Sequence, residues 1–178
     1  IVQEISTHFE TIYNIKPHKR FGNLTLSYAD PSKLGSDRFS AMLGAINHFP
    51  NKPLLVIDIG SAITFDVVDK TGLHHGGLIM PGMKALRGSF EKFKTSDLSL
   101  GLKGLTNNTD DAWQQGTYAM MIGAINYQIE SFQSNFSDGV VTACGGMVKE
   151  IKKELPKSIE LFDNLVLDGL ESYSQSMG

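Results

Sequence analysis

The residues with the clearest chemical potential lie in a short turn at positions 58–61, D-I-G-S. The apolar run 54–57 before the turn indicates a buried strand, and the β-rich run 63–68 indicates its hairpin partner. Gly60 has no Cβ and tolerates positive φ, so the backbone can come close to a ligand there. Backbone N–H groups beside the Ser61 hydroxyl suit a phosphate oxygen, and the Asp58 carboxylate suits a cation. The same residues also fit an ordinary glycine hairpin with a solvated aspartate.

A second candidate site lies at G-S-D-R, residues 35–38, near the start of a helix predicted over 34–49. Ser36 is suited to be the N-cap, and Asp37 then falls in the first turn, where the helix dipole favours a carboxylate. That structural role alone would explain Asp37. The alternative is that Asp37 is a general base, with Gly35 leaving room for a substrate and Arg38 offering a fork to a carboxylate or phosphate.

Other reactive side chains are open to more than one interpretation. Thr109 opens a helix predicted over 110–134, where it serves either as an N-cap alone or also as a ligand contact. His74 and His75 are adjacent in a predicted strand, so they point to opposite faces and are unsuited to share a metal. Cys144 is interpreted as a small buried residue, because no cationic neighbour in the sequence would activate its thiol.

The elements that hold these positions follow from periodicity. Spacing predicts an amphipathic helix over 1–13, and alternation predicts a strand over 21–29. A third hairpin strand is predicted at 73–80, where Gly76–Gly77 indicates a bulge or a close backbone approach. Beyond it we expect helices at 82–93 and 110–134, a strand at 139–146, a helix stopped near Pro156, and a last strand with the start of a short helix at 164–170. From residue 54 the predicted order is β-β-β-α-α-β-α-β-α.

Composition excludes several classes of protein. The 178 residues are 41% hydrophobic and 20% charged, which is typical of globular chains. A net charge of −3 argues against a general nucleic-acid binder. The single cysteine excludes an internal disulfide framework and fits a reducing compartment. No apolar run approaches the ~20 residues that span a bilayer, and no signal-peptide pattern is present. We therefore expect a cytoplasmic protein without nucleic-acid or membrane partners.

The element order around a D-x-G-[ST] turn resembles one lobe of the actin-like ATPase and sugar-kinase superfamily. Further motifs narrow the resemblance: G-S-D-R (35–38), G-G-L-I-M-P-G (76–82) and N-T-D-D-A-W-Q-Q-G (108–116). Together with the D-I-G-S-A-I-T-F-D stretch (58–66), the C-G-G turn (144–146) and D-N-L-V-L-D-G-L (163–170), they are similar to type III pantothenate kinase. Each motif is weak alone, but their shared order from Asn23 to Leu170 makes the set specific.

The resemblance implies a role for each matching residue. Asp37 matches the general base that takes the proton from the primary hydroxyl of pantothenate. Asp58 matches the ligand of a monovalent cation, K⁺ or NH₄⁺. Ser61, together with Gly60, matches the ATP-phosphate contact, although the family usually has threonine at this position. The pantothenate contacts are matched by Tyr28, Gly35, Ser36, Asp37, Arg38 and Thr109.

The implied activity is the ATP-dependent phosphorylation of pantothenate to 4'-phosphopantothenate, the first step of coenzyme A biosynthesis. ATP, Mg²⁺ and a monovalent cation are the implied cofactors, and the implied assembly is a homodimer with its active sites near the subunit interface. Two alternatives stay open. One is a non-catalytic accessory or regulatory binding protein, since some relatives were first described as accessory factors for transcription. The other is a different small-molecule kinase of the superfamily. The Asp37–Arg38 pair and Asp58 favour an enzyme, because a binding protein has no need of a base.

The expected fold class is α/β, with a mixed sheet and flanking helices. We expect residues 51–178 to form a C-terminal ribonuclease-H-like lobe, and residues 1–50 to be the remainder of a second, N-terminal lobe with the helix that carries Asp37. The family has a further D-x-G-N-T turn in its N-terminal lobe, which grips the ATP phosphates and Mg²⁺. No such motif lies upstream of residue 35. The resemblance therefore indicates that the N-terminal part of a family member is missing and that the ATP site is incomplete.

Overall fold

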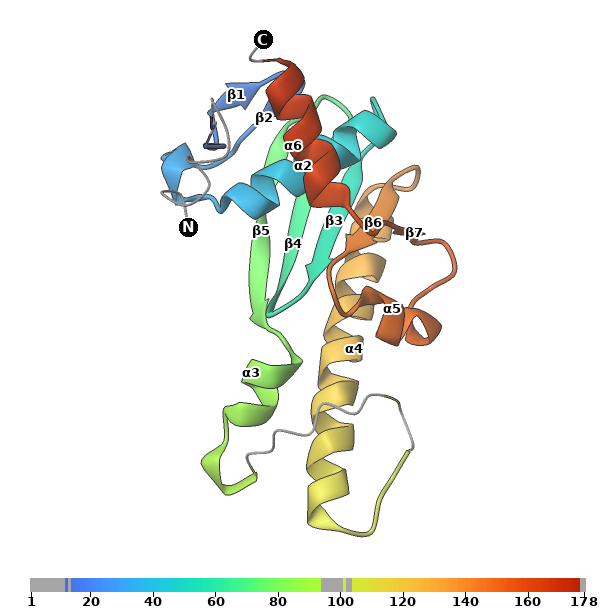
Figure 1. Cartoon of the computed structure of the whole chain (residues 1–178). Helices are drawn as coiled ribbons and strands as arrows, with labels where there is room; N and C mark the ends of the chain where they lie inside the picture. The colour runs from blue at the N-terminus through green and yellow to red at the C-terminus, as the bar shows by residue number, and fades with distance from the viewer. Residues whose placement is uncertain (1–11, 13, 94–100, 102–103, 177–178) are drawn as a thin grey trace.

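The fold is built around a five-stranded mixed sheet with the strand order β5-β4-β3-β6-β7 (Figure 1). This computed structural model describes residues 12, 14–93, 101 and 104–176. β3 (Leu54–Ile59), β4 (Ala62–Val68) and β5 (His74–Pro81) form an antiparallel meander. β6 (Val140–Cys144) pairs parallel with β3, and β7 (Glu160–Leu161) pairs parallel with β6. This arrangement confirms the predicted α/β class, a ribonuclease-H-like sheet with flanking helices.

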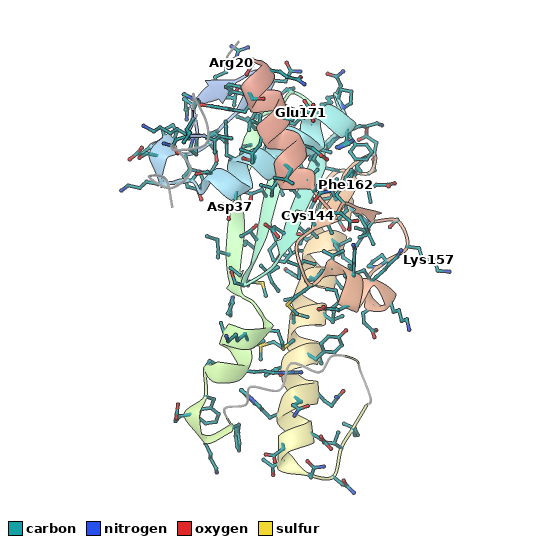
Figure 2. The ribbon with its side chains drawn as sticks, viewed as in Figure 1. Arg20, Asp37, Cys144, Lys157, Phe162 and Glu171 are labelled. Carbon is teal, nitrogen blue, oxygen red and sulfur yellow. The ribbon has the colours of Figure 1, made fainter. Side chains whose placement is uncertain are left out.

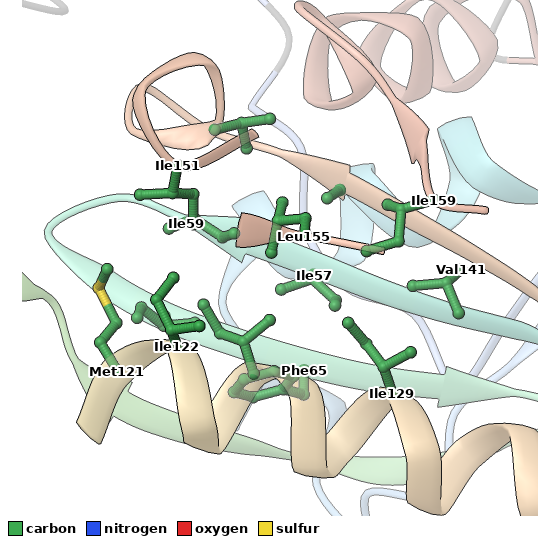
Figure 3. Packing of buried hydrophobic residues seen from close by; sticks show 14 of the residues in the cluster. Ile57, Ile59, Phe65, Met121, Ile122, Ile129, Val141, Ile151, Leu155 and Ile159 are labelled. Carbon is green, nitrogen blue, oxygen red and sulfur yellow. The ribbon is translucent and has the colours of Figure 1, made fainter. Parts of the chain in front are cut away.

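The two faces of the sheet are covered by different helices (Figure 1). α4 (Thr109–Asn135) packs on one face, while α2 (Ser36–His48) and α6 (Leu165–Gln175) cover the other. β3 serves both faces because successive side chains of a strand point to opposite sides. Leu55, Ile57 and Ile59 belong to the α4 cluster, whereas Leu54 and Val56 belong to the α2–α6 cluster. Figure 3 shows Ile122 and Ile129 of α4 packed beneath Phe65 and the strands.

The segment before α2 is less regular than its sequence pattern. The predicted strand over 21–29 is reduced to a short hairpin of β1 (Arg20–Phe21) and β2 (Leu24–Thr25). The predicted alternation of buried and exposed side chains is still seen at Leu24 and Leu26, which are both buried. The 3-10 helix η1 (Pro31–Lys33) follows and leads into α2. The helix predicted over 1–13 lies almost wholly outside the described residues.

An arm of helices extends beyond the sheet at the lower end of Figure 1. It consists of α3 (Met83–Gly88), the 3-10 helix η2 (Glu91–Phe93) and the first half of α4. The single helix predicted over 82–93 is therefore broken into two pieces. α4 itself matches the predicted long helix, but its buried face begins only at Thr117, and Ala112 and Ala119 are exposed.

The C-terminal elements follow the predicted order with one shift. After β6 come α5 (Val148–Ile151) and the 3-10 helix η3 (Lys152–Glu154), which end just before Pro156 as expected. The last strand, predicted within 164–170, is instead β7 at Glu160–Leu161, and residues 165–170 are helical in α6. Leu165 is buried. A buried leucine at this position fits a strand as well as a helix, so the apolar pattern alone could not distinguish the two.

α2 packs on the same sheet as the elements that follow it. Phe39, Met42 and Leu43 of this helix join Leu165 of α6 and the strands in one cluster. The division of the chain at residue 50 into two lobes stays a prediction. Among the described residues, the helices are all too short or too polar to traverse a lipid bilayer.

Candidate functional site

Asp58 is placed by the end of β3, on the face of the sheet that α2 covers. It is the penultimate residue of the strand, directly opposite Cys144 of the parallel strand β6. Its side chain is half-buried. The pKa of Asp58 is raised, first by burial and then by the negative charge of Asp37. The structure therefore brings Asp37 and Asp58, which are 21 positions apart in the sequence, into one electrostatic environment.

Asp37 lies in the first turn of α2, as predicted (Figure 2). The N-cap, however, is Gly35 in an extended conformation, and Ser36 is already the first helical residue, so the prediction of Ser36 as cap is wrong. Asp37 Oδ1 accepts the backbone N–H of Arg38 at 2.8 Å. Its side chain is otherwise exposed to solvent. An exposed carboxylate held at a helix start can accept a proton from a substrate hydroxyl.

The turn after β3 differs from the expectation in one respect. The φ of Gly60 lies outside the left-handed region, and its N–H donates to the carbonyl of Ala62 at 3.0 Å. A glycine is required instead at Gly145, in the C-G-G turn. Its φ is +104°, and a Cβ there would lie 2.4 Å from Asp58 Oδ1. Gly145 thus lets the backbone after β6 approach the Asp58 carboxylate closely.

A cavity of about 1080 Å³ opens beside this turn. Its lining includes Gly60 and Ser61 of the β3–β4 turn, Lys84 of α3, and Gly146 and Met147 after β6. Ser61 is exposed at this position, as a phosphate contact would need to be. Sequence reasoning missed Lys84 and Met147. The signal for Lys84 was present, since it follows the P-G turn that ends the third hairpin strand.

Arg38 is buried rather than directed at solvent, with 6% of its surface exposed. Its Nε and Nη2 donate to Asp66 Oδ2 and Oδ1, at 2.8 and 2.6 Å. Nη1 donates to the hydroxyl of Tyr28 at 3.1 Å. The predicted fork is therefore filled by a carboxylate of this chain, and Tyr28 and Arg38, both predicted substrate contacts, touch each other.

Asp66 and His74 complete this cluster, and the sequence analysis did not single out Asp66. His74 Nε2 lies 2.9 Å from Asp66 Oδ1, and the His74 ring stacks on Tyr28 with centroids 5.9 Å apart. His75 instead meets Asp69 on the exposed side, so the two histidines point to opposite faces as predicted. A signal for Asp66 was present in the sequence, because it is a charged residue within an otherwise apolar strand. In the hairpin register Asp58 pairs with Thr64, so Asp66, two residues further, lies on the same face of the sheet as Asp58.

Cys144 and Thr109 lie in contrasting settings. Cys144 is buried as predicted, and burial, together with the charge of Asp58, raises the pKa of its thiol to about 12. Thr109 is the first residue of α4, but the N-cap is Asn108, whose side chain accepts the N–H of Asp111 at 2.9 Å. The prediction of Thr109 as cap is therefore wrong. Thr109 begins α4, and the first half of this helix lies in the arm that extends beyond the sheet (Figure 1).

Comparison with known proteins points to one family. A family model of type III pantothenate kinase matches residues 2–131. The type III pantothenate kinase of Herminiimonas arsenicoxydans is 35% identical over 159 residues, which cover 85% of this chain and 61% of the relative. That of Xanthomonas campestris pv. campestris strain B100 is 31% identical over 180 residues, covering 98% of this chain and 72% of the relative.

Among solved structures, a conserved protein from Campylobacter jejuni, described as a Baf family transcriptional activator, matches with a TM-score of 0.59. The match covers 82% of this chain and 65% of that one at 20% identity, and at this identity it shows the fold alone. The chain spans about three-fifths of the length of the Herminiimonas relative. The family model accounts for most of the chain, including Asp37, Asp58 and Thr109. The chain therefore belongs to the type III pantothenate kinase family.

Proposed function

We propose that the protein phosphorylates pantothenate with ATP as the phosphoryl donor, giving 4'-phosphopantothenate. The observation that carries this proposal is the electrostatic coupling of the Asp37 and Asp58 carboxylates, in which the charge of Asp37 helps to raise the pKa of Asp58, near the cavity that begins at Gly60 and Ser61. Phosphoryl transfer depends on positioning and on neutralising charge more than on covalent chemistry. A base, an anionic cation ligand and a cavity for the nucleotide are the parts that such a reaction needs.

In this proposal Asp37 is the general base. Its Oδ1 is engaged by the N–H of Arg38, and the exposed carboxylate accepts the proton of the pantothenate primary hydroxyl. The deprotonated oxygen attacks the γ-phosphorus of ATP, and the bond from that phosphorus to the β-γ bridging oxygen breaks to release ADP.

Asp58 is proposed as the ligand of a monovalent cation, K⁺ or NH₄⁺. Its carboxylate is half-buried and is repelled by the negative charge of Asp37. A bound cation would offset both the energetic cost of burying the carboxylate and this repulsion. Within the part of the chain that the structure describes, no group of three or more His, Cys, Asp or Glu side chains is placed to hold a metal. Mg²⁺ would neutralise the charge that develops on the ATP phosphates, and the resemblance assigns its binding to the D-x-G-N-T turn of the family's N-terminal lobe.

The nucleotide is proposed to occupy the cavity beside the β3–β4 turn. Ser61 offers its hydroxyl to a phosphate, and Lys84 on the same cavity wall offers a positive charge. Gly60 and Gly146 leave the backbone accessible on two sides of the cavity. The apolar side chains of Met83 and Met147 give the remaining wall a surface suited to a purine base.

Pantothenate is proposed to bind at the start of α2, against Gly35, Ser36, Tyr28 and the Nη1 corner of Arg38. Thr109 begins α4, whose first half lies in the arm, so we propose that it reaches a substrate site from a second copy of the chain. That arrangement fits the homodimer with active sites near the subunit interface that the resemblance implies. A cytoplasmic location, where ATP is available, completes the proposal.

A coupled assay of ADP release tests the proposal, with the protein expressed from its complete gene. We expect ADP release to require both ATP and pantothenate, and to fall to background in an Asp37→Asn control. ADP release that is the same with and without pantothenate, but depends on another alcohol, would favour a different small-molecule kinase. Absence of ATP turnover in the presence of pantothenate, Mg²⁺ and K⁺ would favour the accessory binding role instead.

A further inference from the structure

Four polar side chains form a closed cluster beneath α2, beside the proposed site. Asp66 and His74 are 1% and 0% exposed, and Arg38 is 6% exposed. Asp66 bonds to Arg38, Arg38 to Tyr28, Tyr28 stacks on His74, and His74 returns to Asp66. Two members of this ring, Tyr28 and Arg38, are proposed pantothenate contacts. The other two, Asp66 and His74, have no assigned role.

Stability is a poor explanation for such a buried charged cluster. Removing charges from water is costly, and apolar residues of similar volume are often as stabilising as a buried ion pair or more so. Val68, the next residue of β4 on the same face as Asp66, is apolar and buried, so this face could accept an apolar residue here. A cluster that is costly to bury and that touches two substrate contacts is better explained by what it positions.

The strand next to Asp66 is built to admit the ion pair. Asp66 lies opposite Gly77 of β5. A Cβ on Gly77 would overlap the Phe65 carbonyl oxygen of β4, and it would lie 2.5 Å from both Arg38 Nη2 and Asp66 Oδ1. A side chain at this position would therefore clash with the backbone of β4 as well as with the ion pair. This close approach accounts for the second glycine of the G-G-L-I-M-P-G motif.

The contacts leave Arg38 and Tyr28 with defined donors. Burial alone would lower the pKa of Arg38, but the hydrogen bonds and charge of Asp66, with those of Tyr28, raise it, so the guanidinium stays charged. Nε and Nη2 are committed to Asp66, which turns the Nη1 corner toward Tyr28. Because the Tyr28 oxygen accepts from Nη1, the Tyr28 hydroxyl proton is free to donate to a substrate oxygen.

We propose that Asp66 and His74 are positioning residues, which orient the Arg38 Nη1 and Tyr28 hydroxyl donors toward an oxygen-rich, anionic substrate. This inference rests on the proposed function. His74 holds two members of the cluster, since its Nε2 atom contacts Asp66 and its imidazole ring stacks on Tyr28. Arg38 follows Asp37 in the first turn of α2, so the same cluster also anchors the turn that carries the proposed base.

The first test is Asp66→Asn, which keeps the shape of the side chain but removes its charge and one acceptor oxygen. We expect KM for pantothenate to rise about tenfold or more, as the loss of hydrogen bonds to a charged group implies, while KM for ATP changes less than about twofold. A calorimetric Kd for pantothenate should rise in parallel. Asp69→Asn is the matched control, because it makes the same change in the next turn of the hairpin, away from Arg38.

A pair of His74 variants keeps the inference testable if Asp66→Asn does not fold. His74→Phe keeps the ring that stacks on Tyr28 but loses the bond to Asp66, whereas His74→Gln keeps a donor near Nε2 and loses the ring. We expect both to weaken pantothenate binding and neither to change KM for ATP. An unchanged pantothenate KM in Asp66→Asn or in both His74 variants would overturn the inference, as would equal changes in the two KM values.

Different results would contradict the proposed function and the positioning inference. If the parent protein shows no pantothenate-dependent ADP release, the proposed function is wrong. If the parent is active and Asp66→Asn behaves like the Asp69→Asn control, the kinase proposal stands and the positioning inference is wrong.

Discussion

Both faces of the sheet bury side chains of β3, but the two faces carry different chemistry. The α4 face is covered by an apolar cluster that includes Ile57, Phe65 and Ile129 (Figure 3). The α2–α6 face is also largely apolar, yet it encloses Arg38, Asp66 and His74, and Asp58 lies at its edge. The other buried charged side chain in the described part of the chain is Arg87, which lies in the arm against α4.

The difference indicates a division of labour between the faces. An apolar interface stabilises the sheet without specifying any group outside it, because burial of hydrocarbon is not directional. The polar cluster of the other face is directional, since every bond in it fixes the position of a named donor or acceptor. We therefore expect substitutions on the α4 face to change stability, and substitutions on the α2 face to change catalysis or substrate binding.

Asp37→Asn should give the largest effect. Asparagine is close in shape to aspartate and is tolerated at a helix start, so the melting temperature should stay within a few degrees of the parent. Loss of a general base should lower kcat by about 100- to 10,000-fold. Steady-state ADP release, with pantothenate binding measured separately, checks both parts. A variant with more than about a tenth of the parent rate would show that Asp37 is not the base.

Ile129→Ala tests the other face. Ile129 is 1% exposed and packs between α4 and the strands, so its truncation leaves a cavity. We expect a loss of about 2–5 kcal/mol in the free energy of unfolding, measured by urea denaturation. Tyr127→Ala, on the exposed side of the same helix, is the control and should have a much smaller effect. A folded Ile129→Ala protein with an altered KM for pantothenate would break the proposed division between the faces.

Much of this arrangement follows from local sequence. The apolar run before Asp58 and the element order after it predict the sheet and its meander, because strand burial and hairpin pairing are set by neighbouring residues. Gly76–Gly77 predicted a close approach or bulge, and both are present: the register shifts beside Val67, and Gly77 faces the ion pair. The placement of Asp37 in the first turn of a helix was predicted by the same local reasoning.

Contacts between distant segments could not be predicted in this way. The fork of Arg38 looked available to a substrate, because nothing near it in the sequence announces Asp66, 28 positions away, as its partner. The caps at Gly35 and Asn108 were each misplaced by one residue, since two adjacent residues with cap propensity are nearly equivalent locally. The strand at 160–161 is only two residues long, which is too short to show a period.

Asp58→Asn should have a smaller effect, seen as a change in melting temperature that depends on pH and on K⁺. The pKa of Asp58 is raised by burial and by Asp37, so the folded state binds protons more tightly than the unfolded state. Stability therefore falls as the pH rises from the ordinary value of 3.8 through the folded pKa. We expect Asp58→Asn to melt at a higher temperature than the parent at pH 7 without K⁺, and the difference to vanish at low pH.

The same variant tests the cation proposal. If Asp58 binds the monovalent cation, Asp58→Asn should lose stimulation of ADP release by K⁺ and by NH₄⁺, with Na⁺ at the same ionic strength as the reference. Stimulation equal to that of the parent would remove Asp58 from the cation site, whatever the melting experiment shows.

Asp69→Asn should give the smallest effect, with the opposite sign. Burial alone would raise the pKa of Asp69, but bonds from Thr71, from the His75 ring and from the Leu73 N–H together lower it to about 2. Between the folded pKa and the ordinary value of 3.8, the unfolded state therefore binds more protons than the folded state. The stabilisation that the Asp69 carboxylate gives the folded state is complete above this pH range and is lost as the pH falls through it. At pH 7 the variant should lose about 1 kcal/mol, as for one typical hydrogen bond. The deficit should shrink toward pH 2. Asp138→Asn, at a mostly exposed carboxylate, is the control and should change the free energy of unfolding at pH 7 much less. A deficit that does not change with pH would mean that the Asp69 side chain stabilises this turn through its shape and not through its charge.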